Sequence, residues 1–523
     1  MLKRFVIVGG GTAGWIAATF LAKWCEQLPG AQVTLIESSE IGIIGTGEGA
    51  TLQLRRFCEF AGISDSDLLR EADATFKLGI RFRNWRTCDH EYLNPFSNVL
   101  TPTFFDRFGS RVDLLSMHRL ASGKQNATQV NVQCHLIRLG KSPWLIDPDS
   151  DALRNIETVP QILTNEPRSG GWGYSFHFDG HKIGGMLRRR LVGKVQVLDG
   201  IVAEGMLANG DLEAVRLRDG RVVSGDFFLD CSGFHRLLIG KMYESRWVSW
   251  SRHLVNNSAM PFQIEHRNDA PLQSCTGACA LTAGWMWEIP TRDKLRCGYV
   301  FNDGCITPDQ AMREVEAHVG SSIEPLRHIH FDTGRFEQHW IRNCVAIGLA
   351  SNFAEPLEAT SIHSTITQAH LLVLNLQPGR PESWEHVSKA YNKAINDVLD
   401  NIRDYLAMHY LSDRTDSEYW QMLRSRHFVP DSLKEKLDVW QHRFPCDLDF
   451  SGPHDLIAFA LPSHMFVLDG LGLLPPRLAD RQLLEKHKAL LASLDINQSD
   501  CARQISAAAL DHREIINLTT GLT

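Results

Sequence analysis

Apolar residues follow two patterns along the chain. Up to about residue 350 they form short runs bounded by glycine, which is typical of strands. Beyond that point they recur at helical spacing in two long stretches, 360–376 and 387–411, and two shorter segments, 433–440 and 477–494, are also helical in character. The pattern predicts an α/β first part followed by a mainly helical C-terminal part.

A polar stretch that contains prolines, 377–385, lies between the two parts. Proline and polar residues interrupt both helices and strands, so such a stretch is a candidate boundary. The chain has 523 residues, which is long enough for more than one domain. We therefore predict a core over residues 1–380 and a mainly helical region on the substrate side over residues 381–523.

The first apolar strand, 5–8, runs directly into a glycine loop. Gly9, Gly11 and Gly14 have the spacing of a dinucleotide-binding fingerprint. Gly9 permits a tight turn, Gly11 lets the backbone approach a pyrophosphate, and Gly14 lets the helix predicted over 15–24 pack on the strand.

The residues after this loop agree with nucleotide binding. The phosphates would lie at the start of the helix, beside Thr12 and Ala13. A second strand, 32–36, ends in Glu37, which is at the expected distance to accept hydrogen bonds from a ribose. The fingerprint predicts a dinucleotide, against the alternative of a chance glycine turn, but it does not separate FAD from NAD.

Composition narrows the classes of protein that fit. With 43% hydrophobic and 22% charged residues, the chain is an ordinary globular protein. Its net charge of −7, without a basic run, argues against a nucleic-acid partner. No apolar stretch approaches the roughly 18 residues of a spanning helix, and the N-terminus enters a strand at once. We therefore expect a cytoplasmic enzyme without a membrane partner.

The twelve cysteines are scattered along the chain. The closest pair, Cys275 and Cys279, has no second pair and no histidine pair at metal-binding spacing. We expect reduced thiols and no metal site.

Two further strands run into glycine turns downstream. In the first, apolar residues 227–229 lead into Asp-Cys-Ser-Gly-Phe at 230–234, and in the second, 344–347 leads into Gly348. Each could be an ordinary strand-to-turn junction. The three glycine segments in this order, with the Asp-x-Ser-Gly-Phe run, resemble the flavin-dependent halogenases. The resemblance implies a Rossmann-like FAD-binding core of the flavin monooxygenase kind, with Gly348 at the flavin.

Residues 355–361 read Glu-Pro-Leu-Glu-Ala-Thr-Ser and precede a predicted helix. They resemble the halogenase run Glu-Pro-Leu-Glu-Ser-Thr-Gly, which implies that Glu358 is the catalytic carboxylate and that the amides of Thr360 and Ser361 bind halide. Ala359 and Ser361 depart from that run in their side chains, although every residue still supplies an amide. Taken alone, Glu358 is an acidic residue favoured by the helix dipole, and the Thr/Ser pair can cap the helix.

Residues 75–82 alternate, with phenylalanines on one face and Lys77 on the other. Taken alone, Lys77 is a solvated lysine on a half-buried strand. The runs Ala-Thr-Phe-Lys at 74–77 and Phe-Arg-Asn-Trp at 82–85 resemble the halogenase segment that bears the essential lysine. The resemblance implies that the Lys77 ammonium polarises hypohalous acid, or that its neutral amine is halogenated transiently.

Two more runs match the same family, and the resemblance covers most of residues 1–420. The loop at 45–51, Gly-Thr-Gly-Glu-Gly-Ala-Thr, resembles the flavin-side loop, although the usual proline is missing. It implies FAD contacts at Gly47 and Ala50.

The run at 285–290, Trp-Met-Trp-Glu-Ile-Pro, matches a Trp-x-Trp-x-Ile-Pro motif of the family. In the halogenases it lies near the flavin, where the indoles keep an organic substrate away from the cofactor. By itself, an alternation of aromatic residues more often lines a core. The resemblance assigns the flavin side to Trp285, Trp287, Ile289 and Pro290.

Beyond Tyr419 the resemblance thins. Tryptophan-selective halogenases carry a tyrosine pair, a glutamate and a Phe-Trp element here, which hold the indole and the amino-acid groups. This chain has no tyrosine after Tyr419 and no tryptophan after Trp440. The matching neighbourhood offers His454 and Phe459 as substrate contacts. We expect indole or a simple indole derivative as substrate, in preference to free tryptophan.

These runs together predict an FADH2-dependent halogenase that chlorinates or brominates an electron-rich arene. Halide held at Thr360 and Ser361 is oxidised to hypohalous acid, Lys77 receives it, and Glu358 assists the aromatic substitution. The chain has one glycine fingerprint, so a separate NAD(P)H-dependent flavin reductase is the expected partner. Two alternatives stay open, a flavin hydroxylase that oxidises NADPH itself and a non-catalytic flavin-binding protein.

Overall fold

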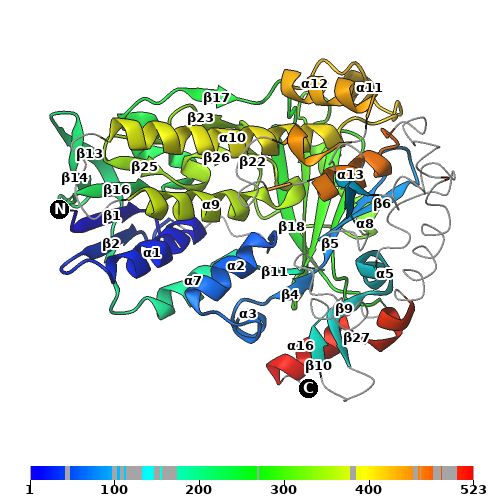
Figure 1. Cartoon of the computed structure of the whole chain (residues 1–523), viewed down its shortest axis with the longest axis horizontal. Helices are drawn as coiled ribbons and strands as arrows, with labels where there is room; N and C mark the ends of the chain where they lie inside the picture. Colours follow the sequence, from blue (N-terminus) through cyan, green and yellow to red (C-terminus); the bar gives the residue numbers. More distant parts are fainter. Residues whose placement is uncertain are drawn as a thin grey trace. The chain divides into compact units, whose positions relative to one another are not determined.

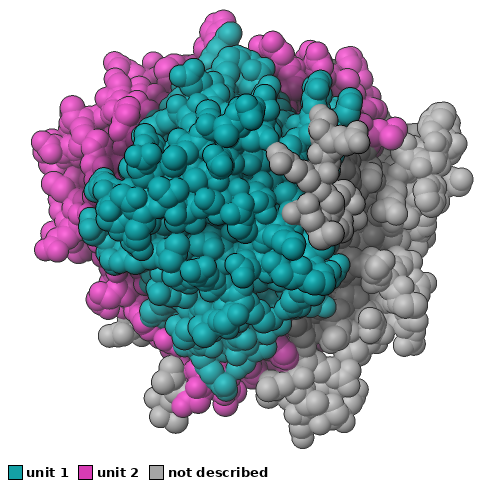
Figure 2. All heavy atoms as spheres, turned by 90° about the vertical axis from the view of Figure 1, so that its left-hand side faces the viewer, with its two compact units in different colours: residues 1–73, 178–254, 331–403 teal, residues 74–177, 255–330, 404–523 magenta. Residues whose placement is uncertain are grey.

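The computed structural model describes residues 2–41, 47–96, 132–146, 173–267, 270–376, 384–443, 445–450, 458–459, 461–474, 485 and 503–521, with short strands at 103–105, 111–113 and 153–155. The chain forms two compact units, coloured separately in Figure 2. Unit 1 comprises Met1–Asp73, Phe178–Leu254 and Phe331–Arg403, and unit 2 comprises Ala74–His177, Val255–His330 and Asp404–Thr523. These units differ from the division expected at residue 380, because strands distant in sequence pair within each unit.

Unit 1 is built on a six-stranded sheet with the order β12-β2-β1-β16-β25-β24. Five of its strands run parallel: β12 (Val195–Asp199), β2 (Gln32–Glu37), β1 (Arg4–Val8), β16 (Phe227–Asp230) and β25 (Cys344–Ala346). Only β24 (Trp340–Ile341) is antiparallel in this sheet. The five parallel strands follow the 3-2-1-4-5 order of nucleotide-binding folds. The predicted α/β fold with a Rossmann-like core is confirmed.

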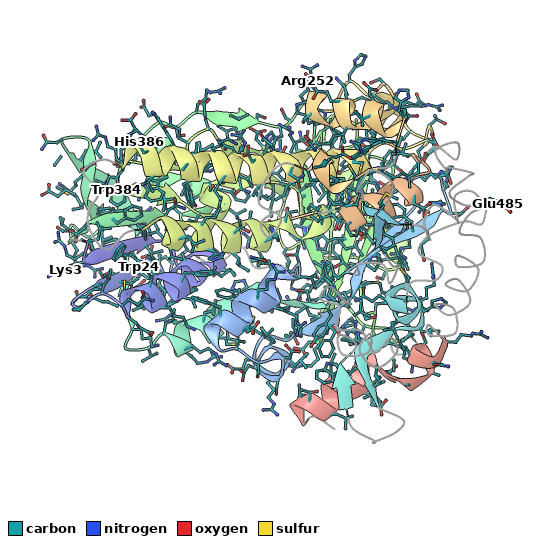
Figure 3. The ribbon with its side chains drawn as sticks, viewed as in Figure 1. Lys3, Trp24, Arg252, Trp384, His386 and Glu485 are labelled. Carbon is teal, nitrogen blue, oxygen red and sulfur yellow. The ribbon has the colours of Figure 1, made fainter. Side chains whose placement is uncertain are left out.

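Both faces of this sheet are buried, which explains why its strands are continuous apolar runs. On one face, the ring of Phe5 packs edge-on against Trp24, and Phe227 packs against Trp384; both tryptophans are labelled in Figure 3. On the other face, Val6 belongs to a core shared with a three-stranded antiparallel sheet. That sheet consists of β13 (Val202–Ala208), β14 (Asp211–Leu217) and β15 (Val222–Ser224).

Unit 1 also contains helices: α1 (Thr12–Cys25), α2 (Gln53–Ala61), α3 (Asp65–Glu71), α7 (Gly180–Arg190), α9 (Thr360–Asn375) and most of α10 (Glu385–His409). The two long stretches of helical spacing are confirmed as α9 and α10. These helices run side by side in Figure 1, and the Tyr391 hydroxyl on α10 donates to the carbonyl oxygen of Gln368 on α9 at 3.1 Å.

Unit 2 contains a seven-stranded sheet with the order β22-β18-β21-β20-β19-β5-β6. Its strands are β22 (Ile329–His330), β18 (Ser258–Glu265), β21 (Lys294–Phe301), β20 (Gly284–Pro290), β19 (Thr276–Ala280), β5 (Gly79–Arg83) and β6 (Glu91–Pro95). The pair β19 and β5 is parallel, and the other neighbours are antiparallel. Helix α8 (Pro308–Val319) packs on one face through Ala311 and Val315.

Unit 2 also contains further strands and helices. β4 (Thr75–Lys77) pairs with β11 (Ser175–Asp179), and β9 (Lys141–Ile146) pairs with β10 (Leu153–Asn155) and β27 (Ala509–Asp511). The helices are α5 (Val132–Leu139), α11 (Glu418–Arg424), α12 (Asp431–Trp440), α13 (Leu461–Gly470) and α16 (His512–Thr520). The helix predicted over 433–440 is confirmed as α12, whereas 477–494 lies outside the described residues except Glu485.

None of the helices in the described part of the chain has the length and apolar character of a membrane span. Within the same residues, no group of His, Cys, Asp or Glu side chains could hold a metal ion. Cysteines there are free thiols.

Candidate active site

The three fingerprint glycines have different surroundings in unit 1. Gly9 has φ +118°, and a Cβ there would collide with the carbonyl oxygen of Cys231. A Cβ at Gly14 would collide with the carbonyl oxygen of Gly9, so the helix approaches the strand closely. A Cβ at Gly11, by contrast, would meet no atom within 4 Å. The chain itself therefore requires Gly9 and Gly14, while Gly11 borders open space that a ligand can fill.

The same space lies at the start of α1. Gly11 is the N-cap residue, and no side chain caps the helix. The first-turn amides at Thr12, Ala13 and Gly14 can thus serve an anion, as helix N-termini commonly do. The Thr12 hydroxyl is engaged elsewhere, since it donates to the carbonyl oxygen of Gly180 at 3.3 Å. An open glycine beside an uncapped helix fits the diphosphate of FAD.

Glu37, the expected ribose ligand, ends β2 beside this loop. A Cβ at Gly10 would lie 2.5 Å from Glu37 Oε2, so the carboxylate reaches the glycine backbone. Its other oxygen, Oε1, forms an ion pair with Arg188 of α7 at 2.6 Å. Arg188 therefore orients the Glu37 carboxylate, and Oε2 is the oxygen that lies toward the glycine loop.

The third glycine segment contacts the first. Gly348 has φ +70°, and a Cβ there would lie 2.7 Å from the Cβ of Ala13. The Gly348 amide donates to Gln368 Oε1 at 2.8 Å, and Gln368 Nε2 donates to Ser351 Oγ at 2.6 Å. Gln368, on α9, thus holds the loop against α1. Sequence reasoning missed Gln368, because its only local feature is a polar residue inside an amphipathic helix.

The second glycine segment is organised by Asp230. This buried carboxylate accepts hydrogen bonds from the Ser232 amide and hydroxyl and from the amides of Leu238 and Ile239, at 2.6–3.1 Å. Burial raises its pKa, while these hydrogen bonds oppose the rise. Asp230 shapes the turn and has its oxygens occupied by the protein.

The loop that begins at Gly47 contains a half-buried acid that the sequence motifs did not single out. Gly47 and Ala50 are buried, and between them lies Glu48. Burial first, and the charge of Asp179 second, raise the pKa of Glu48 to about 7. A Cβ at Gly180 would lie 2.5 Å from Glu48 Oε1, so the carboxyl abuts the start of α7. The only sequence clue was an acid inside a glycine-rich loop.

The predicted halide site lies at the start of α9. Pro356–Glu358 form a 3-10 turn, Ala359 follows in the left-handed region with φ 57°, and α9 begins at Thr360. Ala359 is the N-cap residue, and no side chain caps the helix. The expectation that Thr360 and Ser361 cap this helix is therefore wrong, because both already belong to its first turn. Their amides remain available to an anion, and the side chain of Glu358 is buried.

A histidine on the next part of α9 reaches the flavin-side loop. His363 Nδ1 lies 2.9 Å from the hydroxyl oxygen of Thr51, and both residues are buried. The contact joins residues 312 positions apart, which explains why local sequence patterns could not reveal it. Within unit 1, α9 thus holds the flavin-side loop through His363 and the Gly348 loop through Gln368.

Lys77 lies in unit 2, at the end of β4. The alternating stretch is broken at Leu78 into β4 and β5, and all three residues of β4 are buried. Lys77 is 0% exposed, so the expectation of a half-buried strand is wrong here: both faces of β4 are covered. Its Nζ lies 5.3 Å from the ring centroid of Phe96, within reach of a cation–π interaction. A fully buried lysine is uncommon and often functional.

A chain of hydrogen bonds links β4 to the tryptophan-bearing strand β20. The Thr75 hydroxyl donates to the carbonyl oxygen of Pro290 and lies 3.1 Å from His177 Nδ1. His177 Nε2 in turn lies 3.0 Å from the hydroxyl of Thr276. Burial first, and then the charges of Lys77 and His512, hold the pKa of His177 well below its usual value. His177 is therefore neutral, and it adds no charge beside Lys77.

The two tryptophans of β20 have different environments. Trp285 is 0% exposed and packs against Trp85, as the core interpretation of this run expects. Trp287 rests on Gly298, where a Cβ would collide with the indole, and its N–H has no hydrogen-bond partner among the described residues. Ile289 and Pro290 are buried on the same strand.

Of the two expected substrate contacts, His454 lies outside the described residues. Phe459 is buried, and its ring stacks on Tyr405 with centroids 3.9 Å apart. The Tyr405 hydroxyl accepts a hydrogen bond from Asn94 Nδ2 at 2.9 Å. Phe459 thus has a packing partner within unit 2.

A family model for tryptophan halogenase matches residues 4–485. Among curated relatives, the tryptophan 7-halogenase RebH of Lentzea aerocolonigenes is 32% identical over 505 residues, which are 91% of this chain and 92% of RebH. The tryptophan 6-halogenase ThaL of Streptomyces albogriseolus is 31% identical over 463 residues, covering 86% of this chain and 83% of ThaL.

Solved structures agree with these relatives. A tryptophan halogenase from Shewanella frigidimarina superposes with a TM-score of 0.86 at 27% identity, over 100% of this chain and 98% of that chain. BrvH, a flavin-dependent halogenase from Brevundimonas sp., superposes with a TM-score of 0.82 at 28% identity, over 99% of each chain.

Proposed function

Because this chain belongs to the tryptophan halogenase family, we propose that it uses FADH2 to halogenate an electron-rich arene, with Lys77 and Glu358 as catalytic residues. Bound FADH2, together with dioxygen, would supply the chemistry that oxidises one halide ion by two electrons; with one proton consumed, the products are hypohalous acid, FAD and water. Hypohalous acid and the arene then give the haloarene and a second water. A separate flavin reductase would deliver the reduced cofactor, as family members require.

The observation that carries the proposal is the arrangement of two uncapped helices in unit 1. The start of α1 borders the open glycine position that fits the diphosphate of FAD. The start of α9 presents the amides of Thr360 and Ser361, and α9 holds the two loops proposed to contact FAD through His363 and Gln368. Amides at an uncapped N-terminus stabilise an anion, so the first turn of α9 would hold chloride or bromide.

The two catalytic side chains suit different parts of the reaction. The Lys77 ammonium would donate a hydrogen bond to hypohalous acid and make its halogen more electrophilic. Burial keeps water from competing for that hydrogen bond, since Lys77 is 0% exposed. The Glu358 carboxylate would stabilise the cationic arene and accept the proton that leaves the ring.

Mass spectrometry of a panel of indoles and phenols tests this function. The enzyme, FAD, NADH and a flavin reductase should give haloarenes with chloride or bromide, and leaving out the reductase should stop both product formation and NADH oxidation. NADPH oxidation by this chain alone would instead identify a flavin hydroxylase. Bound FAD without a halogenated product from any arene would identify a non-catalytic flavoprotein.

For the substrate we propose indole or a simple indole derivative. The chain lacks the tyrosine pair and the Phe-Trp element that hold an amino acid in tryptophan-selective members, and Phe459 already packs on Tyr405. A pocket without partners for an ammonium and a carboxylate penalises a zwitterion by desolvation.

Equimolar indole and tryptophan competing for limiting FADH2 should therefore yield mostly haloindole, by roughly 10-fold or more. Without tight orientation of the ring, halogen should enter at its most electron-rich carbon, on the pyrrole side. Tryptamine and indole-3-propionate, which each lack one charge of tryptophan, are the matched controls. A product pool dominated by tryptophan halogenated on the benzo ring contradicts the substrate proposal.

A further inference from the structure

The strand that carries Lys77 is held on its second edge by a side chain. β4 pairs with β11 along one edge, where Lys77 is opposite Ser175. No further described strand pairs with the other edge of β4. On its other edge the Phe76 amide donates to His512 Nε2 at 3.0 Å. These two residues are 436 positions apart, so the end of the chain returns to the strand bearing the lysine.

The hydrogen bonds of His512 fix its tautomer. Its Nδ1 lies 3.2 Å from the carbonyl oxygen of Leu272, which can only accept. Nδ1 therefore carries the proton, and Nε2 is free to accept from the Phe76 amide. His512 is 0% exposed, and burial lowers its pKa to about 4. The ring is neutral at physiological pH and bridges two backbone groups.

The C-terminal segment that carries His512 is itself anchored in unit 2. β27 pairs with β9, with Ala509 opposite Leu145 and Asp511 opposite Lys141. α16 then begins at His512, and Asp511 caps it by accepting from the amides of Arg513 and Glu514 at 2.9 and 3.4 Å. A paired strand and a capped helix hold the imidazole in a defined place.

The backbone on the C-terminal side of Lys77 is also held by a hydrogen bond. The Leu78 amide donates to the carbonyl oxygen of Ser274 at 2.7 Å, two residues beyond the Leu272 carbonyl that His512 holds. The segment 272–274 thus holds the backbone on both sides of Lys77. It accepts directly from the Leu78 amide, and it holds the Phe76 amide through His512. Loss of His512 would free the amide on the N-terminal side, and Lys77 could shift with its backbone.

We propose that His512 is a positioning residue for Lys77, which fixes the backbone of β4 so that the lysine can receive hypohalous acid. This inference rests on the proposed catalytic role of Lys77. A displacement of about 1 Å in a catalytic group can cost up to about 100-fold in rate. The C-terminal residues 503–521 therefore contribute to catalysis because they fix the position of the β4 backbone.

Two substitutions at His512 separate positioning from general stability. In His512→Gln, the amide oxygen can reach the Phe76 amide and preserve the hold on β4. In His512→Asn, the side chain is one carbon shorter, so it can still donate to Leu272 but leaves Phe76 without its acceptor. Both variants keep a neutral polar group in the buried site, so both should fold.

The measurement is the amount of haloindole formed for each FADH2 oxidised, with escaped hypohalous acid trapped by monochlorodimedone. His512→Asn should lower this ratio by about 10-fold or more and raise the trapped acid, while flavin oxidation stays at the wild-type rate. His512→Gln should stay within about threefold of wild type. His409→Asn is the matched control, because His409 is also fully buried in unit 2 and bonds the Tyr92 hydroxyl at 3.1 Å.

Each outcome decides the inference. A wild-type ratio in His512→Asn, with Lys77→Ala uncoupled in the same assay, overturns the positioning role and leaves the proposed function intact. A wild-type ratio in Lys77→Ala removes the catalytic lysine, and the role of His512 with it. Equal losses in His512→Asn, His512→Gln and His409→Asn would show a purely structural histidine.

Discussion

Lys77→Ala should lower haloarene formation by about 10³-fold or more, the upper part of the range for losing a positioned catalytic group, while oxidation of reduced flavin by dioxygen continues at the wild-type rate. The lysine is proposed to act after hypohalous acid has formed, and its side chain lies in unit 2, whereas the glycine loops proposed to bind FAD lie in unit 1. Stopped-flow absorbance of the flavin and mass spectrometry of the product measure the two effects separately.

Two further variants serve as controls for this experiment. Lys77→Met fills the buried site with an uncharged chain of similar length, so a cavity cannot explain its loss of product. Lys294→Ala removes a lysine of the same unit that is 44% exposed and paired with Glu265, and it should leave product formation unchanged. Product within about twofold of wild type in Lys77→Met would contradict the proposed role.

Glu358→Gln should reduce turnover by about 10²-fold or more, the usual scale for losing a positioned base. Glutamine keeps the size of the side chain and its place at the end of the 3-10 turn, but it cannot accept the proton that leaves the ring. Breaking the carbon–hydrogen bond should then limit the rate. A substrate deuterated at the reacting carbon should react more slowly in Glu358→Gln, with little difference in the wild type.

The control for this variant is Glu337→Gln, which removes an exposed acid of unit 1 that pairs with Arg246. It should retain wild-type turnover and show no isotope effect. Glu358→Asp, which keeps the carboxylate but shortens it by one carbon, should lie between Glu358→Gln and the wild type. If Glu358→Gln turns over normally, another group removes the proton.

Some features of the fold and the site could be predicted because they depend on neighbouring residues. Gly9 and Gly14 are needed where a strand turns sharply into a helix, and this geometry is encoded within six residues of sequence. The apolar runs of β1 and β16 predicted strands, and the helical spacing after residue 360 predicted α9 and α10. The matched motifs supplied the family without any knowledge of the packing.

Where a prediction failed, longer-range packing had overridden a local preference. Thr360 and Ser361 are good capping residues, yet the chain turns at Ala359 in the left-handed region and draws both into the helix. Lys77 alternates with apolar residues as a surface lysine does, yet both faces of β4 are covered. Each outcome depends on what lies against the segment, which its own residues do not specify.

The Rossmann-like core and the halogenase family could be recognised from the chain alone, because turns, periodicity and motifs are properties of adjacent residues. The distant residues that support the candidate site became visible in the folded chain: His363 contacts Thr51, Gln368 contacts Gly348 and His512 contacts Phe76. The last pair is 436 positions apart, and no local pattern marks His512. A buried polar group must find a hydrogen-bond partner wherever the fold brings one, irrespective of that partner's place in the chain.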